Sequence, residues 1–233
     1  MPSIVSIFES VVDDMKELPV DTFVNQAATV YEVTFEIRRP HLFVGAEVVV
    51  YYDGGQTVYG TITQILTNKL VYIQLETAID ERLFESLELV LQFLHGHLID
   101  IQQNLIQQTN DPDYKGYKFP LVILPQDIPE PGSAGFESEP TPTAIICIDT
   151  RNTFDAAERY DNSFDNILYP LANMFLEKLE LSPYVFFRKR AKEWIDRLYW
   201  GRESAEGTDA NKLTDYIDGI ELRDLEIKVL QTC

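Results

Sequence analysis

The chain has 233 residues, of which 45% are apolar and 12% aromatic, and its formal charge is −19. This composition predicts a folded globular protein with a sizeable core and excludes a disordered acidic chain. So acidic a surface repels phosphate, which argues against specific nucleic-acid binding and against attachment to an anionic membrane. The two cysteines, Cys147 and Cys233, form no CxxC pair. We therefore expect no disulfide framework, a reducing intracellular site of synthesis, and a buried core thiol at Cys147.

Residues 3–17 predict an amphipathic helix that Ser3 caps and Pro19 ends. Its apolar stripe consists of Ile4, Ile7, Val11 and Met15. The same stretch lacks the early positive charge of a signal peptide, and no apolar run of the chain approaches the ~20 residues of a membrane span.

Residues 29–76 change from helical to alternating periodicity. The stretch EVVVYYDGGQTVYGTITQIL predicts two strands around a turn at Asp53, Gly54 and Gly55, and TNKL predicts a second turn into LVYIQL. Tyr31, Val33, Phe35 and Ile37 alternate with polar residues in the same way. We expect a small β-barrel or curled sheet, inserted after the first helix.

The next segments predict two helices, three strands and a long loop. Residues 80–94 fit either a helix or an alternating strand, and we expect a helix into the high eighties followed by a short strand that reaches His95. Residues 98–108 fit a second helix. YKFPLVIL and TAIICIDT are apolar runs typical of buried strands. The Pro-, Gly- and Glu-rich residues 125–143 between them are either a plain linker or an interaction arm that becomes ordered on a partner.

The last third begins with the longest helical pattern, in which Tyr160, Phe164, Ile167, Leu168, Leu171, Phe175 and Leu179 keep a period of 3.6. Pro170 predicts a kink or a break within it. The final IDGIELRDLEIKVL predicts one or two closing strands.

Between the long helix and the closing strands lies the one basic island of this acidic chain. It comprises Arg188, Lys189, Arg190 and Lys192. A phosphate contact, a solvated helix face, and docking onto an acidic patch of a neighbouring copy all remain open. In the docking interpretation, the aromatic residues that surround the island supply an apolar anchor; they are Tyr184, Phe186, Trp194 and Trp200.

The HGH segment holds two of the three histidines and is a candidate metal site. His95 and His97 share a face if they lie on a strand, and Asp100 would be a third ligand. However, Gly96 is typical of a sharp strand-to-helix turn, and Asp100 would fall in the first helical turn, where the helix dipole favours a carboxylate. We expect a structural turn, with no metal, no cofactor and no catalytic residue.

Several motifs of the chain resemble the tail-completion or tail-terminator-like neck proteins of phages and prophages of Bacteroidetes, including crAss-like phages. The motifs are FLHGHLIDIQQNL, YKFPLVIL, AAERYDNSFDNILYPLANMFLEKL, RLYWG and LTDYIDGIELRDLEI. The resemblance covers residues 1–17 and about 90–230, and it leaves out the β-rich residues 20–78.

The resemblance implies an α+β fold, with a small mixed or antiparallel sheet flanked by helices as in tail terminators, to which the chain adds the β-rich small-barrel lobe. The expected domains are residues 1–19 with 79–233, and the insert 20–78. The implied function is that of a virion structural protein, made in the host cytoplasm, which forms a homo-oligomeric ring of six or twelve copies in the neck.

The implied partners of such a ring are the portal or other neck and tail proteins, and genomic DNA that passes without specific binding; no membrane is involved. Two alternatives from other classes remain: a small soluble enzyme that uses His95 and His97 as a metal or acid–base site, and a β-barrel adaptor protein.

Overall fold

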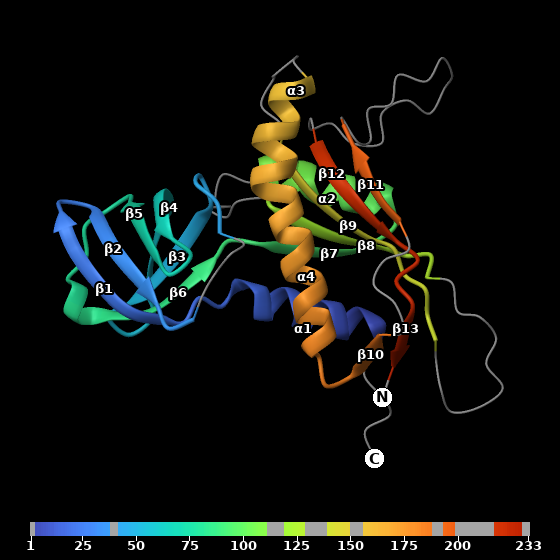
Figure 1. Cartoon of the computed structure of the whole chain (residues 1–233), viewed down its shortest axis with the longest axis horizontal. Helices are drawn as coiled ribbons and strands as arrows, with labels where there is room; N and C mark the ends of the chain where they lie inside the picture. Colours follow the sequence, from blue (N-terminus) through green and yellow to red (C-terminus); the bar gives the residue numbers. More distant parts are fainter. Residues whose placement is uncertain are drawn as a thin grey trace. The chain divides into compact units, whose positions relative to one another are not determined.

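The computed structural model describes residues 3–37, 42–110, 119–128, 139–149, 156–187, 193–198 and 217–229. The chain divides into two compact units, one of Asp13–Val90 and one of Met1–Val12 with Leu91–Cys233 (Figure 1). Both strands and helices are abundant, which confirms the α+β class. Within the described residues, none of the helices is both long and apolar enough to cross a membrane.

The β-rich unit is one six-stranded antiparallel sheet with the strand order β1-β2-β5-β4-β3-β6. Its strands are β1 (Val20–Ala27), β2 (Val30–Phe35), β3 (Glu47–Tyr52), β4 (Gln56–Thr67), β5 (Leu70–Leu75) and β6 (Phe84–Leu89). The predicted hairpin joins β3 to β4, and Asp53, Gly54 and Gly55 of its turn all have positive φ. The predicted TNKL turn joins β4 to β5.

The sheet curls around its own core. Tyr31, Val33 and Phe35 of β2 are all buried, as their alternation predicts, whereas Ile37 lies beyond the strand and is exposed. The ring of Phe23 on β1 stacks on that of Phe84 on β6 at a centroid distance of 4.4 Å. The Leu18 amide also donates to the Leu87 carbonyl, with an N–O distance of 3.2 Å. The two edges of the sheet thus approach each other, as the short strands and tight turns predict.

The helix predicted for the eighties is wrong. Residues Glu81–Leu83 form a single 3-10 turn, in which the Asp80 side chain accepts from the Arg82 amide, and β6 follows immediately. Leu87 and Leu89 fit either periodicity, but their pairing with Val50 and Val48 of β3 buries both of them inside the curled sheet. Tertiary burial therefore selects the strand.

The boundaries of the β-rich unit differ from the segment 20–78 chosen from the sequence. The unit extends to Val90 because β6 pairs with β3, and it begins at Asp13, within the first helix. No described strand of this unit pairs with a strand of the other unit.

The second unit contains a five-stranded mixed sheet with the order β11-β12-β9-β8-β7. Its strands are β7 (Gln92–Gly96), β8 (Leu121–Pro125), β9 (Ala144–Asp149), β11 (Glu193–Arg197) and β12 (Ile217–Arg223). The β7–β8 pair is parallel, and the other three pairs are antiparallel. The predicted strands at His95, in LVIL, in AIICID and in IDGIEL are therefore confirmed.

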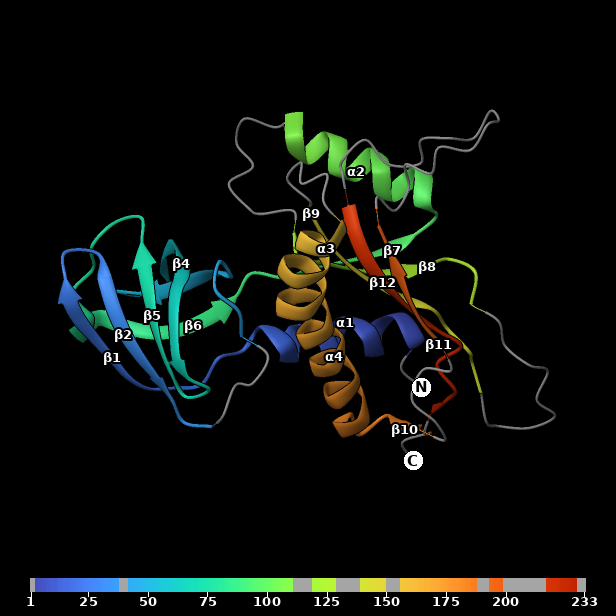
Figure 2. The same ribbon diagram turned by 45° about the horizontal axis from the view of Figure 1, so that its top comes forward.

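Helices cover both faces of this sheet (Figure 2). On one face lies α2 (Leu98–Asn110), whose Ile101 and Leu105 pack in one core cluster with Ile123, Cys147 and Ile217. The opposite face is covered by one helical run made of α3 (Ala156–Arg159), a π-helical segment (Tyr160–Leu168) and α4 (Tyr169–Leu181). Alternation along each strand directs successive side chains to the two helical layers.

Pro170 influences the long helix in a specific way. The run does not stop at the proline; instead it changes from π-helical to α-helical at Tyr169, whose amide bonds to the Phe164 carbonyl. A proline has no amide to donate, and a π-helical stretch is one way in which a helix adjusts its hydrogen bonds around such a gap.

The remaining elements are α1 (Ile4–Lys16) and a two-stranded sheet of β10 (Val185–Phe187) and β13 (Ile227–Val229). The Ser6 amide donates to Ser3 Oγ at 3.1 Å, which confirms the predicted cap. The ring of Phe8 packs against that of Phe175 on α4 at a centroid distance of 5.4 Å. Of the predicted loop at 125–143, residues 129–138 lie outside the described residues.

Candidate interaction surface on β10, β11 and β12

Tyr184 and Phe186, two of the predicted interface residues, are exposed at the end of α4 and on β10. Val185 is buried and pairs with Val229, whereas Phe186 points to solvent opposite Lys228 and is 57% exposed. Leu181, at the end of α4, is exposed as well, although the sequence did not suggest it as an interface residue. These three residues, Leu181, Tyr184 and Phe186, are called the apolar corner below.

The basic island follows the apolar corner directly in the sequence. Arg188, Lys189, Arg190 and Lys192, together with Trp200, lie outside the described residues. The residues on either side of the island are strands, Val185–Phe187 and Glu193–Arg197, and the three interpretations of the island itself stay open.

Trp194 lies on β11 and is 38% exposed. Its ring is 6.3 Å from that of Tyr169 on α4, so one side of the indole is covered by the helical layer. The Tyr169 hydroxyl donates to Asp196 Oδ2 at 2.7 Å. Burial, and then the hydrogen bond to this carboxylate, raise the pKa of Tyr169 to about 12. Trp194 and Asp196 therefore share the face of β11 that is turned toward α4.

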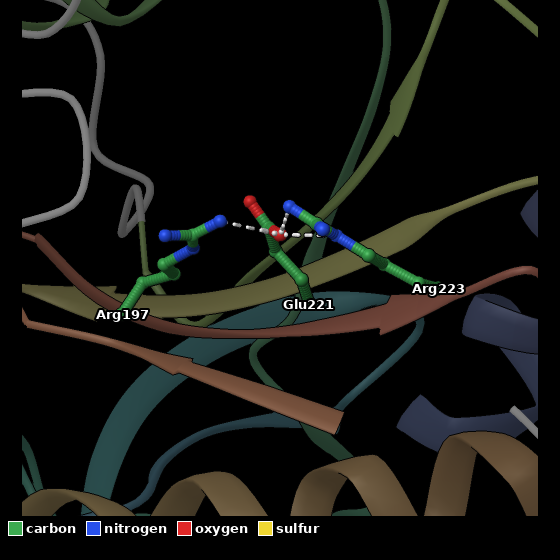
Figure 3. Close-up of polar contacts among 3 residues, drawn as sticks. All are labelled: Arg197, Glu221 and Arg223. Carbon is green, nitrogen blue, oxygen red and sulfur yellow. Dashed lines mark hydrogen bonds and ion pairs between the residues drawn. The ribbon is translucent and has the colours of Figure 1, made fainter. Parts of the chain in front are cut away.

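The opposite face of β11 and β12 carries a charged cluster of Arg197, Glu221 and Arg223 (Figure 3). Glu221 is 7% exposed, and one of its oxygens, Oε2, accepts from Arg197 Nη2 at 3.3 Å and from Arg223 Nε at 2.9 Å. Arg223 Nη2 lies 2.8 Å from the same oxygen. Glu221 thereby fixes the orientation of two half-exposed guanidinium groups.

The sequence alone does not predict this cluster. Glu221 and Arg223 are two positions apart in IELR, and Glu193 and Arg197 are four apart in EWIDR, so each pair falls on one face of its strand. This spacing does not reveal that β11 and β12 are neighbours, so the contact between Arg197 and Glu221 could not be predicted.

A buried ion pair on the other face of the sheet is likewise not predicted by the sequence. Arg159 at the end of α3 binds Asp218 of β12 through two hydrogen bonds, and both side chains are almost fully buried. The pair joins the helical run to the centre of the sheet, so its structural role is evident.

The two histidines of the HGH segment have separate local roles. His95 Nδ1 lies 2.8 Å from the Leu124 carbonyl oxygen on the neighbouring strand. His97 precedes α2, and its Nδ1 accepts from the Ile99 amide at 3.3 Å. Gly96 between them has φ +147° and ends β7, and Asp100 falls in the first turn of α2, so the predicted strand-to-helix turn is confirmed.

The described residues contain no group of three or more His, Cys, Asp or Glu side chains arranged to hold a metal ion. Cys147 is fully buried, as predicted, and its thiol lies 3.5 Å from the Leu121 carbonyl oxygen. Burial raises the pKa of this thiol far above its ordinary value, which leaves it a poor nucleophile.

Comparison with known proteins adds no family to these observations. Neither the family models nor the curated proteins nor the solved structures include a match to this chain.

Proposed function

We propose that this chain is a structural subunit of a phage neck or tail, which assembles as a ring between the portal or head and the tail. The observation that carries the proposal is the exposed apolar corner, which in the sequence precedes the one basic island of an acidic chain. The motif resemblance to phage neck proteins supports the same function.

The aromatic residues of the apolar corner suit the centre of a protein–protein contact. Tyr and Phe are enriched in interface cores, and a small number of such residues contributes most of the binding energy. Strand alternation explains why position 186 faces solvent, but it does not require a phenylalanine there.

Charge explains why the contact would be between unlike surfaces. Copies that each carry −19 repel one another unless patches of opposite sign meet at their boundary. A basic island on one copy and an acidic surface on the next form a head-to-tail contact, and such contacts can close into a ring. We propose six or twelve copies.

The acidic surface also suits a ring through which DNA passes. Carboxylates that line a channel repel phosphates at distances within the Debye length of about 8 Å at physiological salt. Genomic DNA would then move through the ring without specific binding.

The apolar corner gives a direct test of this function. Phe186→Ser should reduce incorporation into particles, or the oligomer mass of the purified chain, because it removes an exposed anchor. Ile99→Ser is the matched control, since Ile99 on α2 is 54% exposed against 57% for Phe186. Equal assembly of the two variants would remove the main support for the proposal.

A β-barrel adaptor is a second candidate, and one observation favours it. The unit Asp13–Val90 has its own buried core and its own tertiary hydrogen bonds; for example, the Tyr31 hydroxyl donates to the Ile79 carbonyl at 2.7 Å. A unit of this kind can bind a partner without any ring, and a chain that stays monomeric while it binds another protein would support the adaptor.

A further inference from the structure

We propose that β11 pairs with β11 of a second copy as an antiparallel ladder, with a two-fold axis at Ile195. The contact would join two five-stranded sheets into one continuous sheet of two copies. It depends on β11 alone and not on the basic island, so it goes beyond the ring proposed above.

β11 is available for such pairing because it is an edge strand. Among the described strands of its sheet, β12 is its one neighbour. An edge strand presents backbone amides and carbonyls in the plane of the sheet, and these groups can be matched by the edge of another chain. With a two-fold axis, β11 of one copy pairs with β11 of the other, and two-fold symmetry is the commonest symmetry of homo-oligomers.

The sequence of β11 is self-complementary when it is reversed. Its five residues are Glu193, Trp194, Ile195, Asp196 and Arg197. Antiparallel pairing centred on Ile195 places Glu193 of each copy opposite Arg197 of the other, and Trp194 opposite Asp196. Pairs of opposite charge directly across a ladder stabilise it, whereas like charges destabilise it.

The neighbouring strand extends this complementarity. Within one copy, Glu193 lies directly across from Arg223 on β12, and Arg197 lies across from Gly219. In the paired sheet, Glu193 would lie between Arg223 of its own copy and Arg197 of the other. Glu221 already orients both guanidinium groups, and the five N–H donors of a guanidinium can serve more than one carboxylate.

The other face of β11 also gains from the pairing. Trp194 is partly exposed, although Tyr169 covers one side of its ring. The indole N–H of each Trp194 could donate to Asp196 of the partner copy, whose Oδ2 is held by the Tyr169 hydroxyl. On the face that carries Glu193 and Arg197, two half-buried Ile195 side chains would meet on the axis.

The other edge of the same sheet is a weaker candidate. The residues of β7 are Gln92, Phe93, Leu94, His95 and Gly96. Antiparallel pairing of β7 with itself, centred on Leu94, would place Phe93 opposite His95 and would bring no carboxylate opposite a cationic side chain. Charge complementarity therefore selects β11. A ladder of five residues a side buries little surface, so we expect a weak, concentration-dependent contact.

Cross-linking tests the predicted register. On the two-fold axis, the Cα atoms of residue 195 in the two copies would be ~4.5–5.5 Å apart, within the range that a disulfide spans. Ile195→Cys in a Cys233→Ser background, where the remaining Cys147 is buried, should form an intermolecular disulfide under mild oxidation. The product is measured as dimer on a non-reducing gel.

Glu193→Cys in the same background is the matched control. Residues 193 of the two copies would be four positions apart along the ladder, about 13 Å, which is beyond the reach of a disulfide. We expect at least tenfold faster dimer formation for Ile195→Cys than for Glu193→Cys. Equal rates, or no dimer from Ile195→Cys at high protein concentration, would overturn the proposal.

Charge reversal provides a readout without a cross-link. Glu193→Lys would place two like-charged pairs across the axis, so the association constant of the full-length chain, measured by analytical ultracentrifugation, should fall several-fold more than for Glu193→Gln. Circular dichroism establishes that both variants are folded. An unchanged association constant in folded Glu193→Lys contradicts the pairing, and reversal of the basic island tests the ring separately.

Discussion

Arg159 and Asp218 face each other in the core of the second unit, where the Arg159 Nε lies 3.1 Å from Asp218 Oδ2 and a second guanidinium nitrogen contacts Oδ1. Their side chains are 2% and 0% exposed. Arg159 ends the four-residue helix α3, and Asp218 is the second residue of β12. One ion pair therefore anchors the start of the long helical run to the sheet.

Removal of one member of this pair should be costly. Arg159→Met would leave the Asp218 carboxylate buried without its cation, and we expect a loss of about 3–5 kcal/mol in the free energy of unfolding. The measurement is denaturant unfolding followed by circular dichroism. The double variant Arg159→Met with Asp218→Leu should be more stable than Arg159→Met alone, because it removes both charges. If its loss in the free energy of unfolding equals the sum of the losses of the two single variants, the residues act independently.

Tyr169 should make stability depend on pH in the alkaline range. Its pKa in the folded chain is raised from 10.0 to about 12, so its contribution is fully present below pH 10 and is lost as the pH rises toward 12. At neutral pH, Tyr169→Phe should cost about 0.5–1.5 kcal/mol through the lost hydrogen bond to Asp196.

The same variant supplies the pH test. Between pH 10 and pH 12, the stability of the wild type should fall more steeply than that of Tyr169→Phe, so the two unfolding curves should converge. Parallel curves across this range would show that the hydroxyl does not hold its proton more tightly in the folded state.

The turn that contains His95 and His97 should tolerate substitution of both histidines. His95→Ala and His97→Ala each remove a local hydrogen bond of about 0.5–1.5 kcal/mol, but assembly should remain largely intact. Elemental analysis of the purified wild type should show no stoichiometric transition metal. One zinc per chain would instead revive the enzyme alternative.

Gly60 on β4 should resist replacement even by alanine. A Cβ at this position would come within 2.8 Å of the Gln74 carbonyl oxygen and 2.6 Å of the Leu75 side chain. Since backbone must move to make room, we expect Gly60→Ala to destabilise the β-rich unit by roughly 1–3 kcal/mol. Thr57→Ala, at an exposed position of the same strand, is the control and should change stability by less than about 0.5 kcal/mol.

The elements that the sequence predicts well are those with an unambiguous period and clear ends. The β3–β4 hairpin follows from the turn at Asp53, Gly54 and Gly55, and α1 follows from its apolar stripe and the Ser3 cap. In both cases the signals lie within about 20 consecutive residues, so no distant contact is needed to interpret them.

The sequence fails to predict the elements and contacts that depend on residues far apart in the chain. Leu83, Leu87 and Leu91 fit a period of 3.6 and so predict a helix at β6, whereas the pairing with β3 selects the strand. The cluster at Glu221 and the pair of Arg159 with Asp218 depend on which strands are neighbours in the sheet. Sequence periodicity carries no information about that order.

The most direct test of the proposed ring is the mass of the full-length chain in solution, determined by light scattering at low and at high salt. We predict a species of six or twelve copies of the 26.8 kDa chain at low salt, or incorporation of the chain into particles at that stoichiometry. Arg188→Glu with Arg190→Glu should weaken this assembly, and high salt should weaken the wild-type assembly in the same direction. A double variant that assembles like the wild type at both salt concentrations, or a wild type that stays monomeric and joins no particle, would contradict the account.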